Sequence, residues 1–391
     1  MQIEDLFEPV RSNLLEGKKF EMHDALRQHV RIFTSGEPFP SDADVDIVLM
    51  GVNEYRGSSE KTKALNAADE VRKKFYSLKR HNHFCRIADI GNFVPGNSIE
   101  DSYFALSSLF TDLIQKNILP IIIGGSEDLG YAQYQAYENL EQLINITSID
   151  SRFDLGGPDD EMNSATYVGK IVLKQPNYLF NYSNIGFQTY YVGQEQIQLM
   201  ERLFFDAYRL GQVQMDLSEV EPIIRSADIL TFDLSAIRQS DAPASIHPSP
   251  NGFYGEEACQ IMLYAGMSDK LSGLGIYEFD PSKKDNGQTA GLISQMIWYF
   301  IEGFTNRKKD LPSGQMEQNF TLYRVPVSGN KQEIIFLKSK KTERWWMELP
   351  FEKTRNRLLR NHFLPCSYKD YQQACNNEIP DRWWQALQKM S

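Results

Sequence analysis

The feature that most constrains the fold is an alternation of short apolar segments with longer amphipathic ones, which begins near residue 46. The apolar segments have the length of buried strands, and the amphipathic ones have helical spacing. Predicted strands lie at residues 46–51, 85–91, 119–123, 144–150, 190–192, 229–234 and 274–279, and predicted helices at residues 61–78, 100–116, 131–143, 255–267 and 289–304. Because this alternation is typical of βαβ units, we expect a three-layer α/β/α domain around a central, mainly parallel sheet.

Three regions follow from the limits of this pattern. Residues 1–45 form an N-terminal extension, residues 46–305 form the α/β domain, and residues 306–391 form a tryptophan-rich C-terminal extension. The C-terminal extension contains a strand-like segment at 333–337 and two Arg-Trp-Trp triplets, at 344–346 and 382–384. Adjacent tryptophans point to different faces of a regular element, so each pair can anchor its segment. We expect this extension to pack on the core, and the alternative is a surface for a protein partner.

Composition excludes several classes of function. The net charge of −11, without a large basic cluster, argues against a nucleic-acid partner. No apolar run is long enough for a membrane span, and the N-terminus lacks the basic start and apolar stretch of a signal peptide. The four cysteines form no CxxC pair, which indicates reduced thiols rather than disulfides or a zinc site. A cytoplasmic location is therefore expected.

Acidic residues follow the predicted strands where a ligand site is expected. In an open parallel sheet, ligands bind beyond the carboxyl ends of the strands. The acids at these ends are Glu127, Asp150, Asp154, Asp233 and Glu278. Carboxylates that converge on one edge repel each other, so they need a cation, an arginine or shared protons to coexist. This convergence is the strongest functional signal that the residues themselves give.

Four segments make the sequence resemble the ureohydrolase family, which includes arginase, agmatinase and formimidoylglutamase. The segment GGSED at 124–128 aligns with the family's motif Gly-Gly-Asp-His-Ser, and DSRFD at 150–154 aligns with its motif Asp-Ala-His-x-Asp. The segment TFDLSAIRQ at 231–239 aligns with the motif Ser-Phe-Asp-x-Asp-x-x-Asp-Pro, and GLGIYEFDP at 273–281 aligns with the motif Gly-Leu-Asp-Ile-x-Glu-x-Asn-Pro. The resemblance covers residues 46–305 in the right order and spacing, and it implies an arginase-like fold.

The resemblance also implies a metal centre, in which the family binds two Mn²⁺ ions around a bridging hydroxide. Carried over by position, the first ion would be held by Glu127, Asp150, Asp154 and Asp233. The second would be held by Asp150 and Asp233 together with Arg152 in place of histidine and Ser235 in place of aspartate.

Glu127 is an acceptable ligand, whereas Arg152 has no lone pair to offer and Ser235 is a weak neutral ligand. We therefore expect the two-manganese cluster to be lost. In one alternative a single Mn²⁺ or Mg²⁺ occupies the first site, and Arg152 fills the second and pairs with Asp150 and Asp233. In the other no metal binds, and Arg152, helped by Arg238 and by raised carboxyl pKa values, neutralises the cluster.

The resemblance assigns two further residues to the substrate. Glu278 corresponds to the family's contact to a guanidinium or amidine group, although it could instead pair with Arg152 or Arg238. Ser164 corresponds to the substrate loop. His247 is expected to be a loop histidine without a catalytic role, and the alternative is that it faces the pocket.

Two classes of function remain. The expected one is a pseudoenzyme, a non-catalytic binding or scaffold protein whose C-terminal extension contacts a partner. The alternative is an active metal-dependent C–N hydrolase that acts on a linear amidine or guanidino substrate with a single-metal or altered site. A sensor that binds a guanidino or amino-acid ligand without turnover is a third option. The resemblance also makes a homo-oligomer plausible, because the family commonly forms trimers or hexamers.

Overall fold

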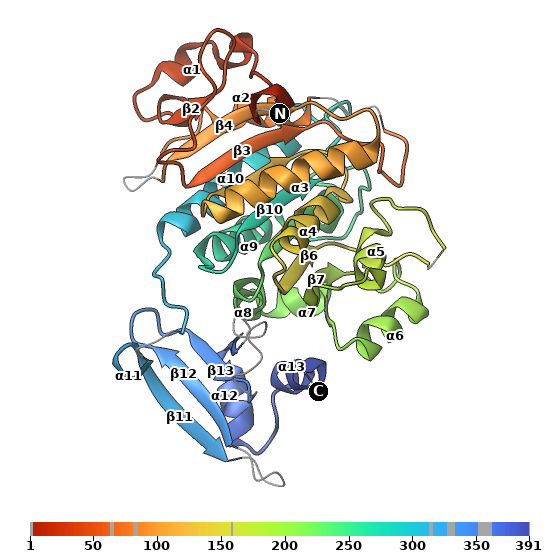
Figure 1. The fold of residues 1–391 in the computed structure, drawn as a ribbon, viewed down its shortest axis with the longest axis vertical. Coiled ribbons are helices and arrows are strands. Elements are labelled where there is room, and N and C mark those ends of the chain that lie inside the picture. Colours follow the sequence, from red (N-terminus) through yellow and green to blue (C-terminus); the bar gives the residue numbers. More distant parts are fainter. Residues whose placement is uncertain are drawn as a thin grey trace.

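The structure is a computed structural model that describes residues 3–62, 66–80, 85–157, 159–312, 316–326, 333–350 and 362–390. Its main feature is a ten-stranded sheet with the order β1-β4-β3-β5-β10-β9-β6-β7-β8, in which β2 also pairs with β4 (Figure 1). The strands are β1 (Phe7–Glu8), β2 (Val30–Ile32), β3 (Ile47–Val52), β4 (Ile87–Phe93), β5 (Leu119–Ile123), β6 (Ile144–Ile149), β7 (Leu179–Phe187), β8 (Asp206–Arg209), β9 (Ile229–Asp233) and β10 (Gly273–Tyr277). Every pairing but β1–β4 is parallel, so the predicted fold class is confirmed.

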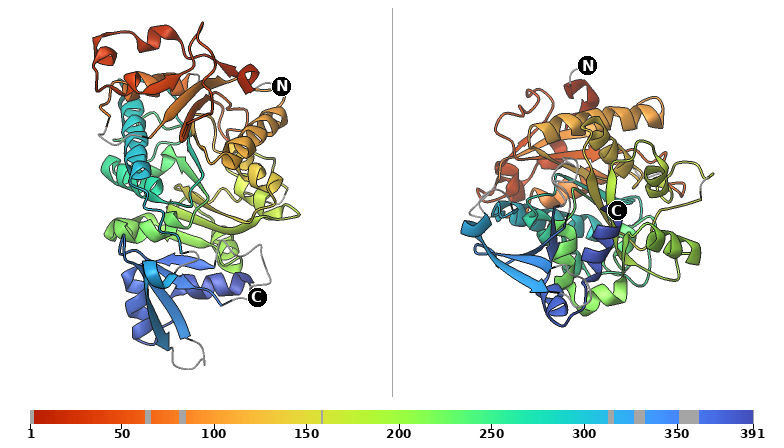
Figure 2. Two further views of the ribbon diagram at one scale, coloured as in Figure 1. Left: turned by 60° about the vertical axis from the view of Figure 1, so that its left-hand side comes forward. Right: turned by 60° about the horizontal axis from the view of Figure 1, so that its bottom comes forward.

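Helices cover both faces of this sheet (Figure 2). One face packs against α2, α9 and α10, and the other against α3 and α4, which gives two separate hydrophobic cores. The α-helices of this part are α1 (Lys18–Glu21), α2 (Ala67–Phe75), α3 (Ile99–Gln115), α4 (Leu129–Asn139), α5 (Tyr167–Leu173), α6 (Gln194–Arg202), α7 (Leu210–Met215), α8 (Val220–Arg225), α9 (Gly255–Met267) and α10 (Gln288–Thr305). Short 3-10 helices lie at Ile3–Leu6, Ser12–Leu15, Leu26–Gln28, Leu217–Glu219 and Leu234–Ala236.

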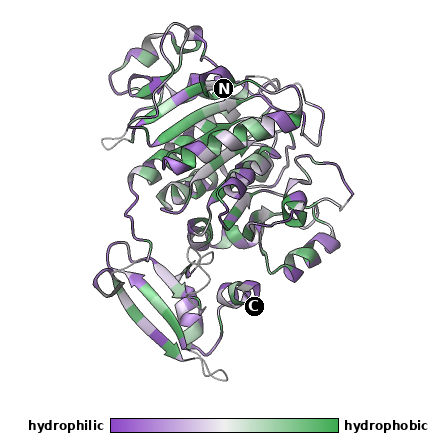
Figure 3. Cartoon of the chain, viewed as in Figure 1, coloured by the Kyte–Doolittle hydropathy of each residue, from purple (hydrophilic) through white to green (hydrophobic). Residues whose placement is uncertain are grey.

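The central strands form because their residues are apolar on both sides. β3 and β5 are buried along their whole length, as a strand covered by helices on both faces must be (Figure 3). Close helix packing also depends on glycine: a Cβ at Gly266 of α9 would lie 2.0 Å from the carbonyl oxygen of Phe300 in α10. These two helices therefore approach each other backbone to backbone.

The predicted strand at 190–192 is wrong. Residues 189–191 form a turn, and the strand of this region is β7, which ends at Phe187. β7 was missed because polar residues occupy its buried interior, among them Asn181, Ser183 and Asn184. Their side chains donate to neighbouring residues: Asn181 Nδ2 donates to Asp206 at 2.7 Å and Ser183 Oγ to the same carboxylate at 2.9 Å. A strand of this kind lacks the apolar run by which strands are recognised.

The residues beyond 305 build a separate small sheet with the order β11-β12-β13-β14. We call residues 316–326, 333–350 and 362–390 the C-terminal module. Its elements are α11 (Met316–Asn319), β11 (Phe320–Pro326), β12 (Glu333–Ser339), β13 (Trp345–Glu348), β14 (Phe363–Cys366), α12 (Tyr368–Cys375) and α13 (Asp381–Met390). The strand predicted at 333–337 is confirmed as part of β12. Trp345 and Trp346 enter different hydrophobic clusters, on opposite faces of the small sheet.

The C-terminal module packs against α8 of the large domain through a buried arginine. Arg225 Nη2 donates to the carbonyl oxygens of Trp345 at 3.1 Å and Cys366 at 3.3 Å. Its guanidinium also lies 4.2 Å from the ring centroid of Trp346. Arg344 of the module pairs with Glu221 of α8 at 3.1 Å. Within the described part of the chain, no helix is long and apolar enough to cross a membrane.

Candidate metal and ligand site

Four neighbouring strands bring their carboxyl ends together at one edge of the sheet. The order β5-β10-β9-β6 places these strands side by side. The turn after β5 requires glycine, because Gly124 and Gly125 have φ values of 89° and 82°. A Cβ at Gly125 would also lie 2.3 Å from Leu129 Cδ1. This tight turn directs the next residues, which include Glu127, back over the ends of the neighbouring strands.

Three carboxylates meet at the centre of this edge. Glu127, Asp150 and Asp233 each offer one carboxylate oxygen, and these oxygens lie within 4.8 Å of one another. All three side chains are buried, and Glu127 Oε2 and Asp150 Oδ2 have no hydrogen-bond partner. Asp154 is also buried, in a left-handed backbone conformation, with its Oδ2 unpartnered. We call Glu127, Asp150, Asp154 and Asp233 the acidic cluster.

Burial and mutual repulsion keep the acidic cluster from ionising fully on its own. Burial is the largest cause that raises the pKa of Glu127, Asp154 and Asp233 well above ordinary values, and the charge of Asp150 is the next. The pKa of Asp150 is also raised by burial, although Ser235 and the backbone and charge of Arg152 counteract this. Unpartnered oxygens beside carboxyls that resist ionisation are what a hard divalent cation would satisfy. The donor set therefore fits a Mn²⁺ or Mg²⁺ ion.

Arg152 does not lie where it was expected. Its guanidinium is stacked on the ring of Tyr191, 4.5 Å from the centroid, and within the described residues it forms no ion pair with Asp150 or Asp233. The prediction that Arg152 replaces the second metal ion by pairing with these acids is wrong. The stack on Tyr191 holds the cation at the rim, where it influences Asp150 only through its charge and its backbone.

Ser235 is inside the cluster, as its sequence position predicted. Its hydroxyl donates to Asp150 Oδ1 at 2.8 Å, and its backbone N–H donates to Asp233 Oδ1 at 2.6 Å. Ser151 Oγ lies 2.9 Å from Ser235 Oγ. The serine therefore links the two aspartates by hydrogen bonds, at the position where the sequence resemblance implied a further carboxylate.

Glu278 and Ser164 lie together on the other side of Glu127. Glu278 Oε1 accepts a hydrogen bond from the backbone N–H of Glu127 at 3.0 Å, and its Oε2 has no partner. Burial raises the pKa of Glu278 to about 8, while Ser164 acts in the opposite direction. No ion pair joins Glu278 to Arg152 or Arg238 in the described chain, so that alternative is wrong.

Two other predicted residues lie outside the acidic cluster. Arg238 pairs with Asp241 at 3.0 Å and lies 3.8 Å from the ring centroid of Tyr254, so the expectation that it neutralises the cluster is wrong. His247 approaches Glu60 at 3.5 Å, and its pKa is lowered by burial first and by the charge of Arg152 among smaller causes. His247 therefore lies near the rim of the site.

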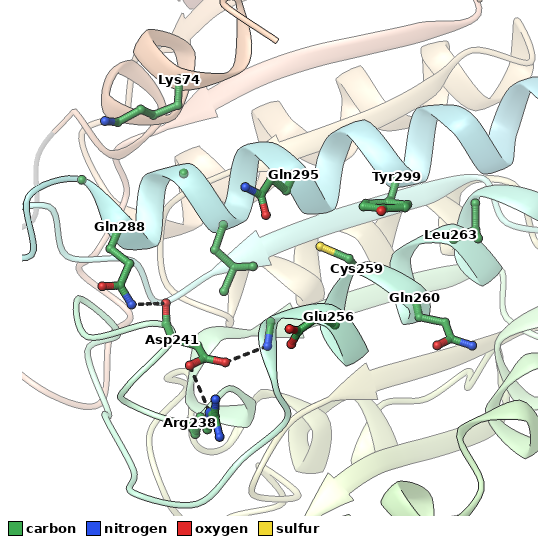
Figure 4. A pocket seen from close by; sticks show the side chains of 14 residues that line it. Lys74, Arg238, Asp241, Glu256, Cys259, Gln260, Leu263, Gln288, Gln295 and Tyr299 are labelled. Carbon is green, nitrogen blue, oxygen red and sulfur yellow. Dashed lines mark hydrogen bonds and ion pairs between the residues drawn. The ribbon is translucent and has the colours of Figure 1, made fainter. Parts of the chain in front are cut away.

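The cavity shown in Figure 4 is separate from the acidic cluster. It measures about 720 Å³ and lies along α9 and α10, with Arg238, Asp241, Glu256 and Tyr299 among its lining residues. No member of the acidic cluster lines it. The size of this cavity therefore says nothing about the ligand of the carboxylates.

Sequence reasoning missed two tyrosines that donate hydrogen bonds to the acids after β5. Tyr167 donates to Glu127 Oε1 at 3.1 Å and lies 3.3 Å from Thr231 Oγ1. Tyr103 donates to Asp128, whose pKa is raised to about 6 chiefly by burial. Tyr167 begins α5 and Tyr103 lies on α3, and neither belongs to the motifs by which the acids were identified.

Comparison with known proteins identifies the family. The sequence model of the arginase family matches residues 45–302, two thirds of the chain. The chain belongs to the arginase family. Among curated relatives, formimidoylglutamase of Enterobacter sp. (strain 638) is 22% identical over 311 residues, which cover 75% of this chain and 97% of the relative. Formimidoylglutamase of Streptococcus gordonii is 26% identical over 250 residues, which cover 58% and 73%.

Solved structures agree on the fold. Trypanosoma cruzi formiminoglutamase, solved with Mn²⁺, superposes with a TM-score of 0.63 at 18% identity, over 69% of this chain and 97% of that one. The agmatine ureohydrolase of Thermoplasma volcanium gives a TM-score of 0.58 at 18% identity, over 70% and 94%. The arginase-family protein described here is thus similar to formimidoylglutamases in sequence and to ureohydrolases in fold.

Proposed function

We propose that this arginase-family protein holds a single divalent cation in the acidic cluster and has lost two-manganese hydrolysis, so that it acts as a non-catalytic binding or scaffold protein. The supporting observation is the contrast between the two ligand sets. Glu127, Asp150 and Asp233 converge with unpartnered oxygens, whereas the second set contains Arg152, stacked on Tyr191, and Ser235.

A cation would be held by Glu127, Asp150 and Asp233, with Asp154 as a further oxygen ligand. When bound, it would supply positive charge that polarises a ligand oxygen or lowers the pKa of a water. Ser235 orients Asp150 and Asp233 by its two hydrogen bonds, and Tyr167 orients Glu127 by donating to Oε1. These contacts position ligands for one ion, and beyond the shared Asp150 and Asp233 the second set offers only Arg152 and Ser235, neither of which is a carboxylate or an imidazole.

The ligand class follows from Glu278. Its unpartnered and buried Oε2 suits a cationic donor group, and a planar amidine or guanidinium would satisfy it with charge-assisted hydrogen bonds. We therefore expect a small guanidino or amidine ligand beside Ser164, bound without turnover. The C-terminal module, which lies beyond the residues matched by the family, is the element that would contact a protein partner.

Metal stoichiometry tests this proposal. Purified protein loaded with Mn²⁺, desalted and measured by mass spectrometry of the metal should carry one ion per chain. The double variant Arg152→His, Ser235→Asp should raise the content toward two ions, because it restores the missing ligands. Two ions per wild-type chain, with release of formamide, urea or ammonia from formimidoylglutamate, arginine or agmatine, would overturn it.

A second candidate is an active C–N hydrolase that uses one metal ion. It is favoured by the retained pair of Glu278 and Ser164, which lie next to Glu127 as a substrate contact should. Turnover of an amidine by wild-type protein that carries one ion, together with loss of turnover in Glu278→Gln, would establish this alternative.

A further inference from the structure

The outermost strand of the small sheet, β11, is paired along one side and, within the described residues, unpaired along the other. Among the strands that the structure describes, β11 pairs only with β12, and it forms the border of the small sheet away from the large domain (Figure 1). Edge strands attract other strands, so proteins usually shield them with charged residues, proline or a covering segment. Over its seven residues, β11 has one charged residue, Arg324, and a proline only at its end, Pro326.

The pairing register determines which backbone groups point outward. The backbone N–H of Lys340 donates to Asn319, and hydrogen bonding alternates along an antiparallel pair. Residues 321, 323 and 325 therefore bond to β12, and the backbone groups of Phe320, Leu322 and Arg324 face away from it. Within the described residues, the N–H groups of Leu322 and Arg324 have no partner.

The residues whose backbone groups face outward include apolar side chains. Leu322 is 38% exposed, although Phe320 beside it is buried against Trp346, 5.6 Å between ring centroids. On the other face Tyr323 lies 5.3 Å from Tyr371, in a cluster of aromatic rings. A strand added to this edge would extend both faces and cover Leu322.

We propose that β11 pairs with β11 of a second copy of this chain, antiparallel, about a two-fold axis at Leu322. This register places each Leu322 opposite its counterpart and each Arg324 opposite Phe320 of the other copy, so the like charges stay apart. The N–H of Leu322 bonds to the other Leu322, and the N–H of Arg324 to the carbonyl of Phe320, for about four backbone hydrogen bonds in all. The two small sheets become one continuous eight-stranded sheet.

The strand fits a second copy because it is complementary to itself. In an antiparallel pair about an axis at Leu322, every unpaired donor meets an unpaired acceptor, and the exposed leucine meets an identical apolar side chain. Pro326, which has no N–H, falls outside the bonded residues. The contact uses residues that the family match does not reach, so it is independent of the proposed metal site.

Two substitutions test the pairing without disturbing the inner hydrogen bonds. Leu322→Lys places like charges on the axis, and Leu322→Pro removes an N–H that points outward and is not used in the fold. The matched control is Leu311→Lys, because Leu311 is equally exposed, at 39%, and lies before the module. Circular dichroism and thermal unfolding verify that each variant is folded.

The measurement is molar mass in solution, by light scattering and sedimentation equilibrium across a dilution series. Both Leu322 variants should have half the mass of the wild type, and Leu311→Lys should keep the wild-type mass. A wild-type monomer overturns the proposal, as does a mass that neither Leu322 variant changes. A wild-type monomer that binds an extended peptide at β11 would assign the edge to a foreign partner and would likewise overturn it.

Discussion

Replacing the buried Arg225 by methionine should loosen the C-terminal module from the large domain. The guanidinium donates to two carbonyl oxygens of the module and stacks on Trp346. Each hydrogen bond from a charged donor contributes about 1.5–3 kcal/mol, and a desolvated cation–π contact contributes about 2 kcal/mol. Burial of the cation costs several kcal/mol in the opposite direction. This burial is also the main reason why the pKa of Arg225 is lowered.

The net effect is therefore smaller than the sum of the contacts. Arg225 also pairs with Glu221 at 3.0 Å, but Glu221 keeps Arg344 at 3.1 Å, so the substitution does not leave an isolated buried charge. We expect Arg225→Met to lower the free energy of unfolding by about 3 kcal/mol, the low end of the effect of breaking a buried ion pair.

Urea unfolding followed by tryptophan fluorescence measures this change, because four of the five tryptophans lie in the C-terminal extension. The control is Lys369→Met at the same interface. Lys369 is 62% exposed and pairs with Asp216 and Glu219, so solvent screens these ion pairs and its loss should destabilise the protein far less than the loss of Arg225. If Arg225→Met and Lys369→Met destabilise the protein equally, the buried contact is not what holds the module.

Three further outcomes are expected. Gly266→Ala should lower the free energy of unfolding in urea by about 3 kcal/mol, because its Cβ would meet a backbone oxygen of α10. The control is Gly291→Ala, which has open space around it and should be neutral or raise the free energy of unfolding by up to about 1 kcal/mol. Mn²⁺ should raise the melting temperature, and Asp150→Asn should abolish this shift if the acidic cluster holds the ion. The pKa of Glu278 is about 8 in the folded chain against 4.5 ordinarily, so the metal-free protein should lose stability as the pH rises between these values. Glu278→Gln should reduce this dependence of the free energy of unfolding on pH by up to about 1.4 kcal/mol per pH unit, as measured by urea unfolding across the pH range.

The sequence predicted the parts of the fold that depend on local pattern. β3, β5, β9 and β10 are short, mainly apolar segments, and their length and spacing are enough to indicate a parallel sheet. The acids at their carboxyl ends followed from the same topology. β7 was missed because its interior is polar, and the hydrogen bonds that allow residues such as Asn181 to be buried form only in the folded chain.

The site was predicted less completely, because side-chain direction depends on distant residues. The convergence of Glu127, Asp150 and Asp233 needs only the sheet order. The position of Arg152 is set by the ring of Tyr191, in a turn that the sequence pattern had assigned to a strand. Because this turn was predicted as a strand, the contact of Arg152 with Tyr191 was missed, and the positive charge of Arg152 was wrongly expected to pair with the acidic cluster.

The C-terminal module is attached at the opposite end of the strands from the carboxylates. Residues of α13 share a small cavity with Asn145 near the start of β6 and with Ser226 just before β9. About five strand residues, on the order of 17 Å, separate that end from the acidic edge. A small molecule at the acidic cluster and a macromolecular partner at the C-terminal module would thus bind without overlapping. Any effect of one on the binding of the other would have to be transmitted along β6 and β9.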